Sequence, residues 1–116
     1  MRKIEETVIG AFVRGESARV SNTETDGEHL WLHGNLIATR LAPTGDWIPT
    51  DLPNRKHVIL FGNAGWDTRT TQSRLNALLE LTHSDKRVAT RDFTQYVIDG
   101  DGNREPVKSF PQHLAA

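Results

Sequence analysis

The chain has 116 residues, of which 36% are hydrophobic and 25% charged, and its 14 basic and 15 acidic side chains leave a formal net charge of −1. We expect residues 1–116 to form a single domain, since domains most often run to about 100–150 residues. The near-zero charge argues against a surface that is basic throughout. The absence of cysteine excludes disulfides and thiolate chemistry. Because no apolar run is long enough for a signal peptide or a membrane span, we expect a cytoplasmic protein that does not contact membranes.

The first predicted element is a helix over residues 2–14. Gly15 stands where a left-handed C-terminal cap belongs, and Arg14 in the last turn suits the helix dipole. A strand is the alternative, because several of these residues are β-branched. The apolar residues recur at helical spacing, at Ile4, Val8, Ile9 and Phe12.

A three-stranded meander is predicted next. Residues 19–25 can be extended, residues 28–33 alternate between polar and apolar side chains, and residues 36–41 supply a returning strand. Asp26-Gly27 and Gly34-Asn35 are the two-residue turn signals between them.

A proline-rich loop and a central strand follow. The prolines of residues 42–56 remove ladder donors, so this segment is predicted to be a loop in which Trp47 and Ile48 fold back as an anchor. The continuous apolar run that ends residues 57–61 is typical of a strand covered on both faces.

The last part of the chain is predicted to hold a second helix and short strands. Thr70 or Thr71 is the expected N-cap. One helix face carries Leu75, Leu78, Leu79 and Thr82. Short strands are expected over residues 87–90, 93–98 and 106–110, with a turn at 99–103 and frayed residues at 111–116. The chain is therefore predicted to be an α+β protein, a small antiparallel sheet with two helices packed on one face, in which the central strand and the second helix cover each other.

Two stretches resemble the patterns of a known family. Residues 30–38 resemble LYLHGN-IA, residues 65–78 resemble GW-T-TT--RLNAL, and residues 21–23 fit an SNT stretch. Over about half its length the chain is thus similar to a family of small uncharacterised proteins encoded by tailed bacteriophages. The resemblance implies a phage origin and a location in the host cytoplasm, and it transfers no catalytic residue.

Neither the histidines nor the acidic turn predicts a metal site. His29 and His33 are four residues apart, but on a strand that spacing is about 13 Å, too far for two nitrogens to bind one zinc ion. Residues 99–105 resemble the start of a calcium loop, yet Arg104 stands where glycine is required. We expect no metal and no cofactor. We also expect no catalytic residue, since no serine or threonine has the glycine-framed turn of an activated nucleophile.

A locally basic segment is the feature that indicates nucleic acid. Between residues 69 and 91, five basic side chains stand against two acidic ones in a chain that is otherwise nearly neutral. Trp31, which alternation places on the face opposite Leu30 and Leu32, adds a ring for base stacking unless the long loop covers it. The candidate nucleic-acid contacts are Trp31, Lys86, Arg87 and Arg91, with Arg69 and Arg74.

The turn before the second helix is the leading candidate for a partner site. Trp66 offers a large rigid anchor, and Arg69 and Arg74 offer bidentate donors beside the positive end of the helix. In the alternative interpretation Trp66 packs inward, Asp67 or Thr70 caps the helix, and the arginines pair with neighbouring carboxylates. A non-enzymatic module that binds a host or phage protein ranks first, a nucleic-acid-binding accessory protein second and an enzyme last, with the oligomeric state left open.

Overall fold

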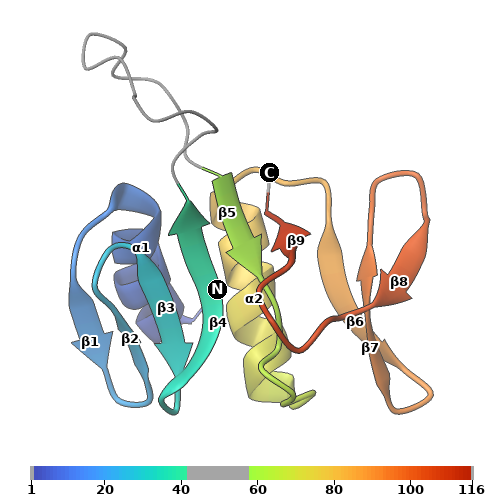
Figure 1. The fold of residues 1–116 in the computed structure, drawn as a ribbon, viewed down its shortest axis with the longest axis horizontal. Helices are drawn as coiled ribbons and strands as arrows, with labels where there is room; N and C mark the ends of the chain where they lie inside the picture. Colours follow the sequence, from blue (N-terminus) through green and yellow to red (C-terminus); the bar gives the residue numbers. More distant parts are fainter. Residues whose placement is uncertain (1, 42–57, 116) are drawn as a thin grey trace, which may run out of the picture.

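The computed structural model describes residues 2–41 and 58–115, which form helices and two antiparallel sheets (Figure 1). The expected anchor at Trp47 and Ile48 lies outside the described residues. The elements are η1 (Glu5–Ile9), α1 (Gly10–Arg14), β1 (Ala18–Val20), β2 (Thr23–Thr25), β3 (His29–Leu32), β4 (Asn35–Leu41), β5 (Val58–Phe61), α2 (Arg69–Leu81), β6 (Arg87–Arg91), β7 (Thr94–Ile98), β8 (Arg104–Pro106) and β9 (His113–Leu114).

The N-terminal segment is helical, as its spacing predicted. A π-helical turn, η1, runs directly into α1, and Gly15 ends the helix with a φ of 79°. This left-handed conformation is one that glycine adopts without steric cost. Val8, Ile9 and Phe12 are fully buried, so the apolar face of the helix is the face that packs on the sheet.

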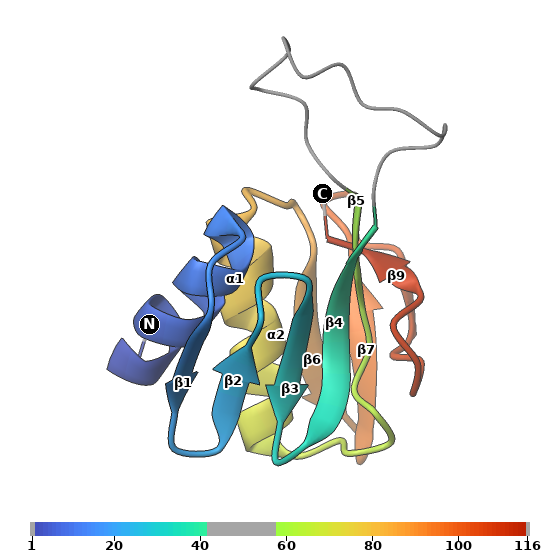
Figure 2. The ribbon, with the colours of Figure 1, turned by 60° about the vertical axis from the view of Figure 1, so that its left-hand side comes forward.

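The first sheet has the strand order β1-β2-β3-β4-β5-β9, and both helices lie on one of its faces (Figure 2). The N-terminal meander has four strands instead of three, because the stretch predicted as one extended segment turns at Ser21 and Asn22. Ser21 has a φ of 55°. A left-handed serine carries no strong turn signal in a sequence, so this turn escaped prediction.

Both predicted turns that follow are present, but the first is longer than two residues and the second is shifted by one residue. The two left-handed residues between β3 and β4 are His33 and Gly34, and Asn35 already pairs with Leu32. At the preceding turn only Gly27 has a positive φ, while the carboxylate of Asp26 accepts from the backbone N–H groups of the next residues. The glycines therefore predicted the positions of both turns correctly. The second turn residue can come before or after the glycine, and the sequence does not show which.

Strand β5 lies inside the sheet, as predicted, between β4 and β9. The prediction that residues 111–116 fray is wrong for 111–115, because His113 and Leu114 pair with β5. Gly62, directly after β5, makes this return possible: a Cβ there would lie 2.3 Å from the carbonyl oxygen of Phe110. Only glycine allows the C-terminal segment to approach the backbone so closely.

The N-cap of α2 lies two residues before Thr70 and three before Thr71, the two predicted caps. Thr68 is the N-cap, and its hydroxyl accepts from the N–H of Thr71 at 3.2 Å. The helix face and the central strand cover each other as expected. Five residues that make this contact are buried in one cluster, namely Ile59, Phe61, Leu75, Leu78 and Leu79.

The C-terminal strands form a sheet of their own, in the order β6-β7-β8, beside α2 (Figure 1). The amide of Asn76 on α2 joins the two elements, because it donates to the carbonyl oxygen of Val88 at 2.9 Å and accepts from its N–H at 2.7 Å. The last strand was predicted at 106–110 but is Arg104–Pro106, so the prediction is wrong for residues 107–110. The α+β class is confirmed, and its strands are divided between two sheets.

Replacing Leu79 with alanine should lower the free energy of unfolding by about 2–5 kcal/mol, because the side chain is 1% exposed and its removal leaves a cavity. Chemical denaturation followed by circular dichroism measures this change. Leu114→Ala is the matched control, since Leu114 is 47% exposed and should cost much less. An unchanged midpoint for Leu79→Ala would contradict the core assignment.

Candidate functional site

Trp66 stands on a short loop between β5 and α2, and its side chain is 57% exposed. A tight turn precedes it, in which the N–H of Trp66 donates to the carbonyl oxygen of Asn63 at 2.8 Å. The two residues inside this turn, Ala64 and Gly65, have φ values of 55° and 83°. A left-handed alanine is uncommon and carries strain, so the surroundings must enforce this conformation.

A buried glutamine ties the two ends of this loop together. Gln95 on β7 accepts a hydrogen bond from the Asn63 amide at 3.2 Å and donates to the carbonyl oxygen of Thr68 at 3.0 Å. The first and last residues of the loop that carries Trp66 are thus tied to the same side chain. Gln95 is 2% exposed and Asn63 is 7% exposed, so little water competes for these bonds. Trp66 is therefore presented by a preorganised loop (residues 63–68).

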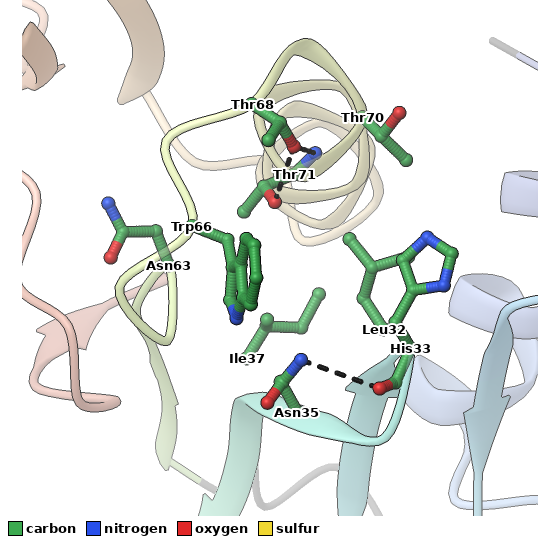
Figure 3. Close-up of a pocket in the computed structure, with 9 residues that line it drawn as sticks. All are labelled: Leu32, His33, Asn35, Ile37, Asn63, Trp66, Thr68, Thr70 and Thr71. Atoms are coloured by element: carbon green, nitrogen blue, oxygen red, sulfur yellow. Dashed lines mark hydrogen bonds between the residues drawn. The ribbon is translucent and has the colours of Figure 1, made fainter.

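One side of this loop borders a hollow of about 320 Å³. Figure 3 shows the indole of Trp66 facing the side chains of Leu32 and Ile37 across it. A polar rim surrounds this apolar floor, formed by His33, Asn35, Asn63, Thr68, Thr70 and Thr71. The two stretches that carry the phage resemblance, at 30–38 and 65–78, thus supply nearly all of one hollow. Its size is at the lower end of ligand sites and suits one bulky apolar side chain.

A second hollow lies on the other side of the loop, against the β6–β7 turn and Phe93. Phe93 is 96% exposed, and both turn residues, Asp92 and Phe93, have left-handed φ values of 51° and 66°. This conformation favours Asn-Gly, and for a bulky aromatic residue it is strained. Trp66, Phe93 and the two hollows together form what we call the aromatic end of the molecule.

Arg69 and Arg74, the arginines predicted beside Trp66, lie in different environments. Arg69 is exposed in the first turn of α2. Arg74 is 3% exposed and points into the protein, where its guanidinium donates to Glu5 at 2.8 Å and to the hydroxyl of Thr23 at 3.0 Å. Arg74 is thus a structural residue in this conformation, which matches the alternative interpretation for that side chain.

The carboxylate of Glu5 has several donors. Burial alone would raise the pKa of Glu5, but hydrogen bonds from Ser73, from the backbone N–H of Arg2 and from Arg74 outweigh it and hold the pKa below its usual value. The Ser73 hydroxyl donates at 2.5 Å. Glu5 therefore remains ionised beside Arg74, and the pair joins η1, α2 and β2.

Arg74→Ala should destabilise the fold by about 3–5 kcal/mol, because it leaves the charge of Glu5 buried and unpaired. Urea denaturation measures the loss. The matched variant is the double change Glu5→Gln, Arg74→Met, which removes both charges and should recover much of the stability. If Arg74→Ala unfolds at the wild-type urea concentration, the side chain is not the structural residue described here.

The candidate nucleic-acid residues do not form one surface. Trp31 lies half-buried on β3, stacked on His29 with ring centroids 5.3 Å apart. Lys86 precedes β6 and donates to the carbonyl oxygen of Leu114. Arg87 and Arg91 are exposed on β6, in the other sheet from Trp31.

His113 is a buried histidine whose two ring nitrogens both have polar contacts. One ring nitrogen lies 2.9 Å from a carboxylate oxygen of Glu105, and the other accepts from the N–H of Lys108 at 3.2 Å. Burial lowers the pKa of His113, although the Glu105 carboxylate opposes this effect. A neutral ring satisfies both contacts, whereas a second proton would break the bond from Lys108. Within residues 2–41 and 58–115, no group of three or more His, Asp or Glu side chains is placed to hold a metal ion.

The lowered pKa of His113 predicts a pH dependence of stability. The unfolded chain takes up a proton on this histidine near pH 6.5 while the folded protein does not, so stability is complete above about pH 6.5 and falls as the pH drops below it. Thermal melts between about pH 7.5 and 5.5 should show this loss. His113→Gln should reduce it, since the other histidines are common to both proteins; parallel curves for the two proteins would contradict the assignment.

The sequence comparison now defines the class: the chain is a phage protein. It belongs to the Kyanoviridae Gp96 protein family, whose model matches residues 1–113. No curated protein and no solved structure matches the chain. No helix of the described residues is long and apolar enough to cross a membrane. The phage origin implied by the resemblance is confirmed, and the function has to be argued from the site.

Proposed function

We propose that the protein is a non-enzymatic phage accessory module that binds a host or phage protein in the host cytoplasm through its aromatic end. The supporting observation is the exposed indole of Trp66 on a loop that Gln95 holds at both ends. Tryptophan is enriched among the residues that contribute most to protein interfaces. A clamped loop loses little conformational entropy on binding, so more of the contact energy becomes affinity.

The hollow beside Trp66 suits a protruding apolar side chain of a partner. Its floor of Leu32 and Ile37 offers apolar contact, and the Asn35 and Thr70 side chains on its rim offer hydrogen bonds to a partner backbone. Phe93 adds a second exposed ring across the loop. An apolar centre with a polar rim is the usual organisation of a protein interface.

Two of the hydroxyls near Trp66, those of Thr68 and Thr71, are engaged at the start of α2, which favours a binding role over catalysis. Thr68 and Thr71 lie 3.0 Å apart, oxygen to oxygen, and Thr68 also accepts from the N–H of Thr71. A hydroxyl engaged with its own helix lacks the adjacent base that activates a nucleophile.

Trp66→Ala should abolish capture of the partner while leaving the fold intact, because the indole is mostly outside the core. The tagged protein is incubated with nuclease-treated lysate of phage-infected host cells, captured proteins are identified, and one recurrent partner is purified. Calorimetric titration should then show a fixed stoichiometry and a loss of about 30-fold or more for Trp66→Ala, the effect of a 2 kcal/mol hot spot.

Trp31→Ala is the matched control, since it removes the same side chain from the opposite face of the first sheet and should bind like the wild type. Equal affinity for Trp66→Ala, or equal losses for both variants, would contradict the proposal. A partner released by nuclease treatment would point instead to nucleic acid as the bridging molecule.

A further inference from the structure

The second sheet has one face against α2 and one face away from it. Val88 and Thr90 face the helix: the Val88 side chain is buried in the core, and the Thr90 hydroxyl donates to Gln72 on α2 at 2.6 Å. Alternation along β6 therefore turns Arg87 and Arg91 to the opposite side. We call that opposite side the outer face of the sheet.

Strand register brings a third arginine and a ring to this outer face. Arg87 pairs with Ile98, and Ile98 pairs with Arg104 on the other edge strand. Residues directly opposite each other in a sheet share a face. Tyr96, two residues before Ile98 on the central strand, lies on the same side, and the guanidinium of Arg104 sits 5.4 Å from the centre of its ring.

The outer face is positively charged in a protein with a net charge of −1. Its register positions on the three strands hold three arginines and no carboxylate; Glu105 faces the other way, where it meets the buried His113. None of the three arginines forms an ion pair with a carboxylate of residues 2–41 or 58–115. The carboxylate of Asp99, in the adjoining turn, is occupied by the N–H groups of Asp101 and Asn103.

We propose that this outer face binds single-stranded nucleic acid, with Arg87, Arg91 and Arg104 on the phosphates and Tyr96 under the bases. The arginines lie on the two edge strands and the tyrosine ring on the central strand. In a single strand of nucleic acid the phosphates run beside the bases, so the arginines can contact phosphates while the ring stacks on a base. Arg87 and Arg91 are about 13 Å apart along β6, so they contact separate phosphates. This surface is on the second sheet, whereas the hollow beside Trp66 is lined by residues of the first sheet. The proposal therefore goes beyond the proposed function.

Fluorescence anisotropy with labelled single-stranded DNA and RNA of one mixed sequence, about 16 nucleotides long, tests the proposal. Three phosphate contacts predict that affinity falls about 20-fold between about 50 and 200 mM salt. The triple variant Arg87→Ala, Arg91→Ala, Arg104→Ala should lose binding. Tyr96→Leu, which keeps an apolar side chain, should weaken it about tenfold with an unchanged salt dependence. The DNA and RNA arms show which sugar the face accepts.

The control is a triple variant that removes the same charge elsewhere, Lys3→Ala, Arg14→Ala, Arg19→Ala, and it should keep most of the affinity. Trp66→Ala should bind the oligonucleotide normally, which separates this test from that of the proposed function. Absence of binding at about 100 μM protein and low salt, equal losses in both triple variants, or a duplex bound as tightly as the single strand would overturn the proposal. If the arginines only keep edge strands from pairing with other chains, the variant will aggregate and the wild type will bind nothing.

Discussion

The ion pair between Arg74 and Glu5 is the contact on which the arrangement of the other elements depends. Apolar faces alone let a helix slide and rotate with little change in buried area, but a guanidinium and a carboxylate must meet at 2.8 Å with their remaining donors and acceptors satisfied. Because Arg74 also reaches Thr23, one side chain fixes η1, α2 and β2 relative to each other. We infer that the pair specifies the register of α2 more than it adds to stability.

Both proposed surfaces depend on where α2 lies. Its N-terminus begins at the end of the Trp66 loop, and Asn76, half a turn beyond Arg74, binds the backbone of β6 through both of its amide atoms. A rotation of the helix would therefore move the tryptophan and the second sheet together. This common dependence explains how a small protein can keep an aromatic end and a basic sheet face on one rigid frame.

Local patterns predicted most elements, because helix spacing, strand alternation and glycine turns are properties of neighbouring residues. They failed where a residue's environment is set by distant parts of the chain. Arg74 was placed on the surface because arginine usually lies there, but its partner Glu5 is 69 positions away in the sequence. The roles of Gln95 and Asn63 in holding Trp66 were missed for the same reason, and Tyr96 and Arg104 share a face only through a strand register that no short motif encodes. Trp66 was found because a tryptophan after a glycine-bounded turn is a local signal.

The β6–β7 turn is a strained part of the backbone. Two left-handed residues without glycine store about 1–3 kcal/mol each, and this hairpin would close more readily around Asn-Gly. Asp92 and Phe93 therefore make this turn less stable than an Asn-Gly turn would be. Phe93 contributes almost nothing to the core and projects its ring into water, so only a contact outside the molecule can cover it.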